Sequence, residues 1–534
     1  MSGVVPVRQR RVAVVGGGSA GAFCARLLAR RHSDWKIDLY DRIPESEALG
    51  FGVGLTGALL ETIRTVDAAV HADIMSMSFQ FSSASFRLPA GEVFLNAFHH
   101  GVAIDRGGLI RILRHRAEDA GVGMHIGVDA DALALSSEYD VVVAADGVSS
   151  QTRERLGDEL GATVSVGRGQ FIWCGSDTEL PGTTFMPVRT DDGVFVVHAY
   201  PYAEGKSTWV VETDDHALAR AGLGADVYPR GESDEKSLAY LSHAFSDLLG
   251  GRPLLGNASR WAHFRTVRCQ RWSHGNVVLL GDAVATAHPS LGSGTKLAME
   301  GAIALSAAME HSDGSPDAVA QELHSYEAGR RGAVDRLQWR AMQSKIWWES
   351  FPYRMDGSPE RVAVSFMSRG GAVGLDDLRR TDPELVRGAA AAYADVVSDQ
   401  VPPSVPDEWI LGQAAVGNQS TRIVDDLAGL DEIATLTVDF DDAWGERATE
   451  LIEQLRGSAS HASGVVVVTG DAGRPALVHR LAFGERVRLE LGLPVAIVLD
   501  RNLLADGIDA LVAGRVDMLH PIAPATELER VLAQ

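Results

Sequence analysis

The stretch RRVAVVGGGSAGAFCARLLARRHSDWKIDLYDR (Arg10–Arg42) decides the fold of the first part of the chain. An apolar strand over Arg11–Val15 leads directly into a glycine-rich turn, and apolar residues at helical spacing come after the turn. A second strand over Ile37–Tyr40 ends in Asp41. The order strand, turn, helix and strand predicts an α/β fold with a parallel sheet.

The glycines of the turn have separate expected roles. Gly16 permits a tight turn, Gly18 lets the backbone approach a pyrophosphate, and Gly21 allows the helix to pack closely on the strand. The first helical turn, which includes Ser19 and Ala20, then presents free N–H groups and the positive end of the helix dipole to phosphates. The turn is therefore expected to bind the phosphates of a dinucleotide.

The end of the second strand supports this interpretation. The Asp41 carboxylate can accept hydrogen bonds from both hydroxyls of an adenosine ribose, and the adjacent Arg42 is expected at the same site. A glycine-rich turn in an unrelated α/β unit is the alternative, but strand, helix and acid in register favour dinucleotide binding. This stretch alone does not distinguish NAD from FAD.

Two later stretches favour FAD. DVVVAADGVSSQTRERL (Asp140–Leu156) is a strand ending in Asp146-Gly147, and GNVVLLGDAVATAHPSLGSGTKLAMEGA (Gly275–Ala302) is a strand ending in Gly281-Asp282. A flavin enzyme needs a carboxylate for the ribityl hydroxyls, which Asp282 supplies, although any one of these acids could instead cap a helix. A helix N-terminus that stabilises negative charge at flavin N1/O2 is expected after Pro289, at Gly292, Ser293, Gly294 and Thr295.

The three motifs together resemble the group A FAD-dependent aromatic monooxygenases of the para-hydroxybenzoate hydroxylase type, over residues 11–310. In that family the Asp146-Gly147 segment touches both FAD and the nicotinamide donor. Arg106, in VAIDRGGLIRIL, matches a family arginine that contacts FAD. The resemblance implies a Rossmann-like FAD-binding domain interleaved with a β-sheet substrate domain. It also implies tightly but non-covalently bound FAD, reduction by NADH or NADPH, and oxygen transfer from O2 through a C4a-hydroperoxyflavin to an electron-rich ring.

Further stretches are similar to one branch of the family. FIWCGSD (Phe171–Asp177), GVFVVHAYPYAEGKSTWVVETD (Gly193–Asp214) and HPSLGSGTKLAME (His288–Glu300) resemble the salicylyl-CoA 5-hydroxylase and 2-aminobenzoyl-CoA monooxygenase/reductase group. SFMSRGGAVGLDDLRRTDPELV (Ser365–Val386) fits the end of that group's hydroxylase module. Lys296 departs from the wider family, in which Asn is usual, but this branch tolerates Lys.

The residues give less information on the substrate pocket than on the cofactor site. Apolar and polar residues alternate along Gly193–Asp214, which predicts strands of a sheet that covers the flavin ring. His198, Tyr200 and Tyr202 are the expected pocket residues, although each could simply pack in the sheet. His288, just before Pro289 at the expected flavin edge, is the candidate base, and a purely structural role is its alternative.

The expected organisation has three parts. A monooxygenase module covers residues 1–390, in which FAD binds to about 1–75, 100–165 and 265–330. The substrate sheet covers about 76–99 and 166–264, and a helical end covers 331–390. Residues 391–429 form a linker around VPPSVPDEW (Val401–Trp409), and residues 430–534 form a small α/β domain.

The last part, residues 430–534, alternates strand and helix patterns, which predicts a small parallel sheet. Its segment FGERVRLELGLPVAIVLDRNLLADGIDALVAGRVDMLHP resembles the end of old yellow enzyme, an FMN-binding (β/α)8 barrel. Leu499-Asp500-Arg501-Asn502 and Leu519-His520-Pro521 stand where the barrel needs glycines near a phosphate. We therefore expect a degenerate barrel remnant without FMN; a retained second flavin site is the alternative.

Composition bounds the other classes. The net charge of -22 argues against nucleic acid or an anionic membrane as partner. The three cysteines form no CxxC pair, so no metal site is expected. Apolar runs are too short for a membrane span and the first residues lack a signal-peptide core, which makes the cytoplasm the expected location. A homodimer is left open.

The sequence supports three functions in order of preference. The first is hydroxylation of a substituted aromatic acid, as the free acid or as a CoA or carrier-protein thioester. The second is hydroxylation or epoxidation of an indole or polyketide intermediate, because only the pocket would differ. The third, from another class, is a flavin-binding protein without oxygenase activity.

Overall fold

The computed structural model describes residues 9–44, 50–96, 101–229, 231–310, 315–415, 420–427, 430, 432–458 and 464–523. The chain divides into two compact units, which are described separately. The first contains residues 1–83, 100–184 and 188–342, and the second contains residues 84–99, 185–187 and 343–534. One long helix, α12 (Pro316–Glu349), runs through the boundary at residue 342.

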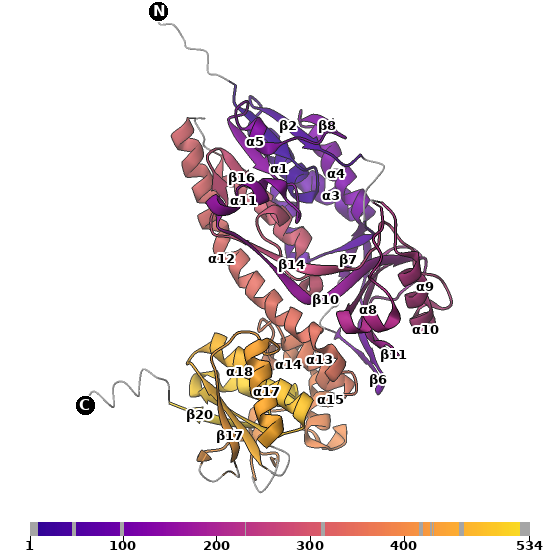
Figure 1. The fold of residues 1–534 in the computed structure, drawn as a ribbon, viewed down its shortest axis with the longest axis vertical. Coiled ribbons are helices and arrows are strands. Elements are labelled where there is room, and N and C mark those ends of the chain that lie inside the picture. Colours follow the sequence, from indigo (N-terminus) through magenta and orange to yellow (C-terminus); the bar gives the residue numbers. More distant parts are fainter. Residues whose placement is uncertain are drawn as a thin grey trace, which may run out of the picture. The chain divides into compact units, whose positions relative to one another are not determined.

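The first unit is built on a six-stranded sheet, of which β16, β2 and β8 are labelled in Figure 1. Its strands have the order β15-β16-β9-β1-β2-β8. All neighbouring strands are parallel except β15 and β16. The central strands are almost purely apolar because helices cover the sheet and both faces of each strand are buried. The strands are β1 (Arg11–Val15), β2 (Lys36–Asp41), β8 (Gly123–Ile126), β9 (Val141–Ala144), β15 (Ser273–His274) and β16 (Val277–Leu279).

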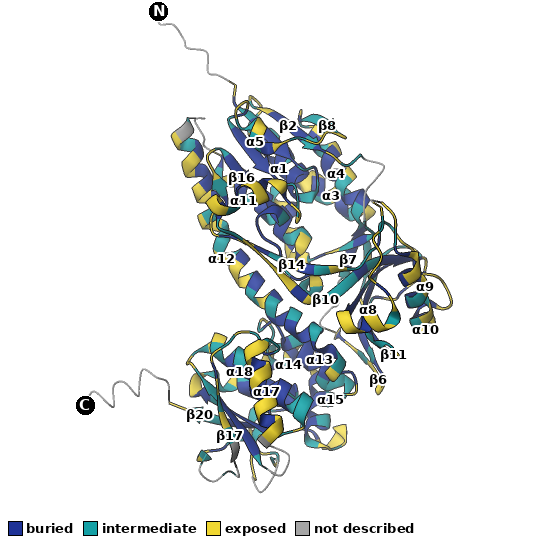
Figure 2. Cartoon of the chain, viewed as in Figure 1, coloured by how far each residue is buried: buried dark blue, intermediate teal, exposed yellow. Residues whose placement is uncertain are grey.

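Helices pack on this sheet and on one another. The helix α1 (Ser19–Arg31) contacts both α4 (Arg106–Glu118) and α11 (Gly294–Ala308), and its inward face is fully buried (Figure 2). The prediction of a parallel α/β unit at Arg10–Arg42 is confirmed by the pairing of β1 with β2. Shorter helices of this unit are α2 (Gly57–Val66), α3 (Ala68–Met77), α5 (Ala132–Leu135), α6 (Gln151–Arg155) and α7 (Gly157–Leu160).

A second sheet of the first unit contains the expected substrate strands. Its strands have the order β14-β10-β13-β12-β11, and the first three neighbouring pairs are antiparallel. A small sheet in the order β3-β7-β4 packs against β12. The strands are β10 (Ala162–Ser176), β11 (Thr183–Thr190), β12 (Gly193–Ala203), β13 (Lys206–Asp214), β14 (Ala262–Cys269), β3 (Gly52–Leu55), β4 (Phe79–Phe81) and β7 (Gly101–Asp105). The helices α8 (Asp215–Ala221), α9 (Glu235–Ala244) and α10 (Ser246–Leu249) accompany them.

The helical part of the second unit has an aromatic core. Phe86 lies 4.9 Å from both Phe185 and Phe366 between ring centroids, and Trp347 and Trp348 join the same cluster. The pair Trp347-Trp348 therefore packs in a core in this structure. The elements are β5 (Ala84–Leu88), β6 (Gly91–Phe94), α13 (Pro359–Ser368), α14 (Leu375–Thr381), α15 (Pro383–Ala394) and α16 (Asp407–Leu411).

The end of the chain forms a four-stranded sheet in the order β17-β18-β19-β20, and all its strands are parallel. This confirms the predicted small parallel sheet; its descent from a barrel stays a prediction. The last strand includes Pro521, which an outermost strand tolerates. The elements are β17 (Glu432–Val438), α17 (Glu446–Ser458), β18 (Val465–Gly470), α18 (Arg474–Leu491), β19 (Val495–Asp500), α19 (Leu504–Val512) and β20 (Met518–Ile522).

Candidate active site

The turn between β1 and α1 brings two backbone segments together. Gly16 has a φ of +104°, and a Cβ atom at this residue would lie 2.2 Å from the carbonyl oxygen of Ala145. A Cβ atom on Gly21 would lie 1.9 Å from the carbonyl oxygen of Gly16. The Cβ position of Gly18, in contrast, has no neighbouring atom within 4 Å. Two glycines thus allow close packing, and the third leaves space for a ligand against the backbone.

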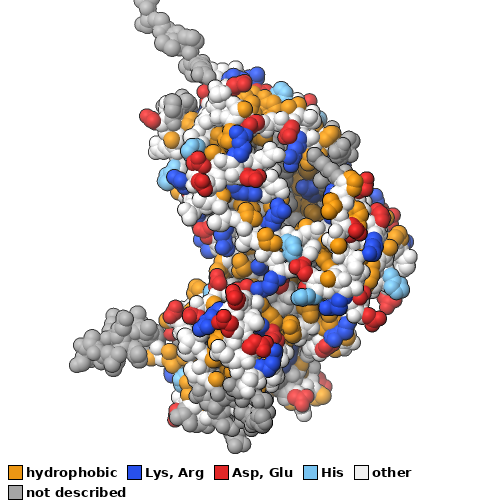
Figure 3. Space-filling model, in the orientation of Figure 1, with side chains coloured by type: hydrophobic (Ala, Val, Ile, Leu, Met, Phe, Trp, Pro, Cys, Tyr) orange, Lys and Arg blue, Asp and Glu red, His pale blue; other side chains and the backbone are white. Residues whose placement is uncertain are grey.

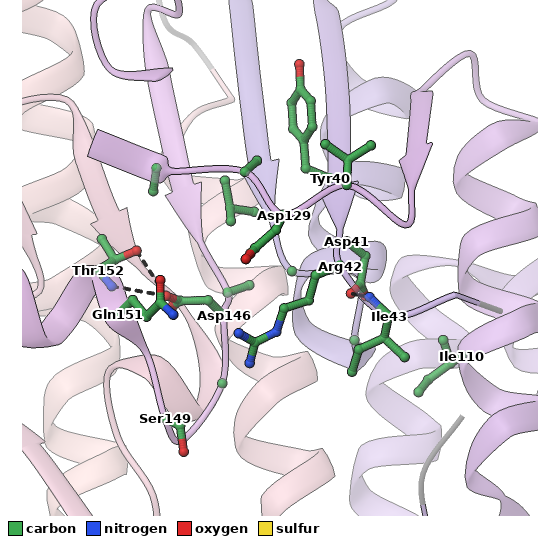
Figure 4. A pocket seen from close by; sticks show the side chains of 18 of the residues that line it. Tyr40, Asp41, Arg42, Ile43, Ile110, Asp129, Asp146, Ser149, Gln151 and Thr152 are labelled. Carbon is green, nitrogen blue, oxygen red and sulfur yellow. Dashed lines mark hydrogen bonds between the residues drawn. The ribbon is translucent and has the colours of Figure 1, made fainter. Parts of the chain in front are cut away.

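A cavity of about 330 Å³ opens at this turn, at the carboxyl ends of β1, β2 and β9 (Figure 4). Ligands of parallel α/β sheets bind at this end of the strands. The Arg42 guanidinium points into the cavity between Asp146 and Ile43 (Figure 4). Among the predicted cofactor residues, the cavity is lined by Gly16, Gly18, Asp41, Arg42, Arg106, Asp146 and Gly147. Ser19, Ala20 and Gly21 lie in the first turn of α1 beside it.

Asp41 is held rigidly at the cavity wall. Its Oδ2 atom accepts hydrogen bonds from the Gly17 N–H at 2.9 Å and from the Arg114 guanidinium, and its Oδ1 atom accepts one from the Ile43 N–H at 2.8 Å. A carboxylate has about four acceptor positions, so these three bonds leave capacity for a ribose hydroxyl. These bonds fix the orientation of the side chain and leave room for one ribose hydroxyl, not for both. The ribose contact stays a prediction.

Asp146 has one satisfied and one unsatisfied oxygen. Its Oδ2 atom accepts from the N–H and the hydroxyl of Thr152, at 3.1 and 3.0 Å (Figure 4). Its Oδ1 atom is buried and has no hydrogen-bond partner among the described residues. A buried acceptor without a partner is costly, so a bound group with a donor would stabilise this position.

Arg153 joins the segment after β9 to the segment after β16. Its Nη1 atom donates to the carbonyl oxygen of Ala283 at 3.0 Å, and its Nη2 atom donates to that of Val148 at 2.6 Å. Gly281 makes a second junction, because its φ is +64° and a Cβ atom there would lie 2.8 Å from Ala20. The motifs predicted from distant parts of the sequence therefore meet at one site.

Asp282 lies at this junction and is partly buried. Burial raises the pKa of its carboxyl group from 3.8 to about 6, against the opposing effect of the nearby Arg106 and Arg153 guanidinium groups. Burial likewise lowers the pKa of Arg106, and Asp282 acts in the opposite direction. A carboxylate this poorly compensated needs further donors, which the hydroxyls of a ribityl chain would supply.

The segment after Asp282 leads into the N-terminus of α11. Pro289 begins a short 3₁₀ turn, Gly292 has a φ of +60°, and the helix begins at Gly294. Ser293, the residue before the helix, has a buried hydroxyl without a partner among the described residues. The N-terminus of α11 therefore presents free N–H groups and a positive helix dipole, and its contact with flavin N1/O2 stays a prediction.

One face of the second sheet carries aromatic and polar side chains in rows, because directly paired residues of antiparallel strands share a face. The first row contains Phe171, Glu212 and Val196. The second row contains Trp173, Val210 and His198, and the third contains Gly175, Thr208 and Tyr200. We call this the pocket face.

The pocket face adjoins the flavin-type site at two points. The Trp173 ring and the Arg106 guanidinium both lie about 3.7 Å from the Cβ position of Gly50. Phe264 stacks on Phe171 with ring centroids 4.1 Å apart, and its ring lies 4.2 Å from that of His288. The sheet therefore provides an aromatic wall between Arg106 and the segment after Asp282.

The predicted pocket residues differ in position. Tyr200 is half-buried and donates its hydroxyl to the carbonyl oxygen of Gly52 at 2.9 Å, and desolvation raises its pKa. The ring of Tyr202 also packs over Gly52, and burial raises its pKa as well. His198 lies in the second row, 3.4 Å from Glu212. Contact of these three side chains with a substrate stays a prediction.

His288 has a local role in this structure. Its Nδ1 atom lies 2.8 Å from the Ser290 hydroxyl and accepts a weaker bond from the Ser290 N–H at 3.4 Å. These bonds shape the 3₁₀ turn that begins at Pro289. A base role for His288 stays a prediction.

Sequence reasoning missed several residues of the site. Arg114 lies two helical turns after Arg106 and four residues after Ile110, and all three line the cavity from one face of α4. That spacing was a readable signal. Glu212 had no such signal, because its proximity to His198 depends on the register of β12 and β13.

Among the described residues, no group of three or more His, Cys, Asp and Glu side chains is arranged to hold a metal ion. No helix within the described part of the chain has the length and apolarity to cross a membrane. On the face shown in Figure 3, acidic and basic side chains are interspersed.

Comparison with known proteins agrees with this geometry. Residues 111–341 match the family model "FAD binding domain". The chain is 34% identical over 501 residues to a salicyloyl-CoA 5-hydroxylase of Streptomyces sp, which covers 91% of this chain and 95% of that protein. The chain belongs to the FAD-dependent aromatic monooxygenases. It is also 34% identical to the 3-hydroxy-4-methyl-anthranilyl-[aryl-carrier protein] 5-monooxygenase of Streptosporangium sibiricum, over 69% of this chain and 96% of that protein.

Solved structures show the same fold. An oxygenase of 2-methyl-3-hydroxypyridine-5-carboxylic acid has a TM-score of 0.50 at 21% identity, and covers 71% of this chain and 98% of that one. PqsL of P. aeruginosa, solved with 2-aminobenzoylacetate, has a TM-score of 0.50 at 18% identity, and covers 64% and 97%. The two relatives at 34% identity, and not the fold alone, show that the protein is an FAD-dependent monooxygenase. Its open glycine turn and the unpaired buried oxygens of Asp146 and Ser293 fit that cofactor.

Proposed function

We propose that the protein hydroxylates the ring of a substituted benzoyl thioester, carried by CoA or by a carrier protein. The observation that carries this proposal is the position of the aromatic pocket face. Trp173 and the cavity-lining Arg106 each lie about 3.7 Å from the Cβ position of Gly50, and Phe264 lies beside His288, after Asp282. This arrangement supports the binding of a planar aromatic substrate beside the flavin ring. The names of the two relatives at 34% identity support a benzoyl-type thioester rather than a free acid.

The cofactor is held along one continuous path in this proposal. Asp41 and Arg42 bind the adenosine end, and the α1 N-terminus at Gly18–Gly21 binds the pyrophosphate. Asp282 binds the ribityl chain, with Arg106 and Asp146-Gly147 along the way. The N-terminus of α11, at Gly292–Thr295, stabilises the negative charge of the reduced ring.

The cofactor, once reduced by NADH or NADPH, supplies an activated oxygen atom derived from O2. The chain's own residues do the remaining work. The pocket face orients the substrate ring, its aromatic side chains exclude water, and the α11 dipole controls charge at the flavin. No side chain has to form a covalent bond with the substrate.

We further propose that this chemistry belongs to residues 1–390, with a linker over 391–429 and a degenerate FMN-free barrel remnant over 430–534. Leu499–Asn502 and Leu519–Pro521, which lack glycine, support the absence of a second phosphate site. The relative from Streptomyces covers 91% of the chain, so at least part of the last region is shared with that enzyme. A cytoplasmic homodimer is the proposed state.

The test is substrate-dependent oxidation of NAD(P)H by the FAD-loaded enzyme, combined with mass spectrometry of the products. Salicylyl, aminobenzoyl and indolic compounds would be supplied both free and as thioesters. A product heavier by one oxygen atom, formed from a benzoyl thioester, is expected. A product from the indolic compound alone would favour the second hypothesis, and NAD(P)H oxidation without any oxygenated product would contradict the proposal.

A further inference from the structure

A small cavity lies inside the second unit, where residues of its helical part meet residues of its α/β part. The cavity has a volume of about 20 Å³, which is room for one group the size of a water molecule or a halide ion. Four charged residues are among the described residues that line it: Arg354, Arg369, Glu485 and Arg515. The first two belong to the helical part, and the last two belong to the α/β part.

The charges at this cavity do not balance. Glu485 supplies the single carboxylate among the described lining residues, against three guanidinium groups. Both oxygens of this carboxylate are bound by Arg354, at 3.0 and 2.8 Å. Arg354, Arg369 and Glu485 are buried, and water therefore screens their charges only weakly. The wall of the cavity consequently carries an excess of positive charge.

Arg515, between α19 and β20, has a buried donor that is not satisfied. Its Nη2 atom donates to the carbonyl oxygen of Ser365 at 2.9 Å and to the hydroxyl of Ser368 at 3.3 Å. Its Nε atom is buried and has no hydrogen-bond partner among the described residues. Burial lowers the pKa of Arg515, against the opposing effect of Glu485. A buried donor without an acceptor is costly, and a ligand with acceptor capacity would remove that cost.

The other two guanidinium groups are held in fixed orientations. Arg354 Nη1 donates to the carbonyl oxygen of Ser350 at 2.9 Å and to its hydroxyl at 2.7 Å. Arg369 Nε donates to the Ser344 hydroxyl at 2.8 Å, and its guanidinium lies 3.7 Å from the centroid of the Phe366 ring. A ligand of the cavity therefore meets groups that lose little further freedom when it binds.

One further acid near Arg515 does not restore the balance. Asp509, on α19, is not among the residues that line the cavity, and its Oδ1 atom accepts the Leu375 N–H at 3.0 Å. Burial raises the pKa of Asp509 from 3.8 to about 7, so this group carries only part of a negative charge at neutral pH. The positive charge at the cavity therefore calls for an anion from solution.

We propose that this cavity binds a small monovalent inorganic anion, and that chloride is the physiological ligand. A water molecule fits the same space, but it would leave the excess positive charge in place. Phosphate and sulfate are too large for a volume of about 20 Å³. The bound ion joins the helical part, through Arg354 and Arg369, to the α/β part, through Arg515. The inference does not depend on the proposed function, because all its residues belong to the second unit.

The first experiment measures whether chloride stabilises the FAD-loaded full-length enzyme. Sodium chloride would replace sodium gluconate at a constant sodium concentration, so that general screening stays the same. We expect a saturable rise in melting temperature with chloride, and the same rise with bromide. Hydrogen–deuterium exchange of peptides from α13 and α18 should slow over the same range of concentrations, which assigns the effect to the second unit.

Variants of the lining arginines should remove this response. Arg515→Met and Arg369→Met should each weaken the apparent chloride affinity about 10-fold or more, because a hydrogen bond from a charged donor is lost. Arg515→Lys keeps the positive charge but not the planar group, and should retain part of the affinity. FAD content and the circular dichroism spectrum must match the wild type in every variant used.

The second unit offers a matched control. Arg361 on α13 is also a largely buried arginine that joins the two parts, because it donates to the carbonyl oxygens of Val512 and Leu511 at 3.0 and 3.1 Å. It is not among the residues that line the cavity. Arg361→Met should therefore keep the chloride response of the wild type, whatever its effect on the melting temperature without chloride.

The second experiment locates the ion directly in the wild type. Crystals grown in sodium bromide should show an anomalous peak in the cavity between Arg354, Arg369 and Arg515. Density for water alone at this place would overturn the inference, even if none of the variants folds. A bromide peak without a saturable chloride response in solution would also overturn it, since the ion would then bind at crystal concentration only. Equal loss of the response in Arg361→Met and Arg515→Met would contradict the assigned site.

Discussion

The same hydrogen bond occurs at a strand–helix turn in two sheets of this protein: a glycine N–H donates to the aspartate that ends the neighbouring strand. In the first, the Gly17 N–H donates at 2.9 Å to Asp41, the last residue of the neighbouring strand β2. In the second, the Gly473 N–H donates at 2.9 Å to Asp500, the last residue of the neighbouring strand β19. Each turn also contains one glycine with a positive φ. It is Gly16, just before the donor, in the first turn and Gly473, the donor itself, in the second, with φ values of +104° and +90°.

The two turns differ at the residue after the donor. In the first sheet that residue is Gly18, whose Cβ position is open, and a cavity of about 330 Å³ lies at the turn. In the second sheet it is Arg474, whose guanidinium pairs with Asp506 at 2.7 Å. A strand–turn–helix with an acid on the next strand is therefore insufficient for a nucleotide site; the space must also be left open.

The two units also differ in how far nearby arginines offset the burial of a carboxylate. Asp282 of the first unit is undercompensated, and burial raises its pKa to about 6. Burial alone would also raise the pKa of Glu485 in the second unit, but Arg354 and its neighbours outweigh it and lower that pKa. Arg354 binds Glu485 through two atoms, at 3.0 and 2.8 Å. The arginines near Asp282 do not offset the effect of burial on its pKa, whereas those near Glu485 do.

The largest effect should come from the matched pair Gly16→Ala and Gly473→Ala. Both residues have positive φ, so each substitution should cost about 1–3 kcal/mol of backbone strain. Gly16→Ala also forces a Cβ atom to within 2.2 Å of Ala145 O, whereas Gly473 has no such neighbour. We expect Gly16→Ala to lose bound FAD after desalting and Gly473→Ala to keep it, as measured by flavin absorbance per chain. Equal FAD retention by the two variants would contradict the difference that we draw between the two turns.

The second largest effect should come from breaking the ion pair between Arg354 and Glu485 in the second unit. Arg354→Met leaves Glu485 buried and unpaired, and should lower the free energy of unfolding by about 3–5 kcal/mol. The FAD content of the folded fraction should not change. Chemical denaturation monitored by tryptophan fluorescence, with flavin content in parallel, measures both quantities. The double variant Arg354→Met/Glu485→Met should recover much of the loss, and a lack of recovery would contradict the ion-pair explanation.

Asp282→Asn should have opposite effects on the apoprotein and on the cofactor. Because the folded pKa of about 6 exceeds the ordinary 3.8, stability from this group is present below pH 3.8 and is lost as the pH rises through 6. The ionised group then costs the apoprotein at most about 3 kcal/mol. Apo Asp282→Asn should therefore melt above the apo wild type at pH 8, with a difference that shrinks toward pH 5. Its FAD affinity should be lower, by calorimetric titration; a lower melting temperature at pH 8 would disagree.

Arg42→Gln should have the smallest effect. Arg42 is exposed and its guanidinium points into the cavity, so its interaction with a phosphate or adenine is screened by water. FAD affinity should fall about 5-fold, and more at low salt than at high salt. Fluorescence quenching of FAD at two salt concentrations measures this. A loss above about 10²-fold would place Arg42 among the principal FAD ligands.

Much of the first unit could be predicted from the sequence, because its signals are local. The motif at Gly16–Gly21 and the strands ending at Asp41 and Asp282 need only a few adjacent residues each, and the parallel sheet joins them. The strand–helix alternation after residue 430 predicted the second parallel sheet for the same reason.

The substrate side could not be predicted to the same depth. The partnership of His198 with Glu212 depends on pairing register, and the position of Tyr200 over Gly52 depends on packing between two sheets. Similarly, nothing local to Arg474 shows that it meets Asp506 across the turn. Such contacts join residues distant in sequence, and no periodic pattern encodes them.

The flavin content of the purified full-length protein tests the central claim most directly. Flavin released by denaturation would be separated and quantified against the protein concentration. The account predicts one FAD per chain, bound at the first parallel sheet, and no FMN. Stoichiometric FMN, or FAD retained after Gly16→Ala but lost after Gly473→Ala, would contradict it.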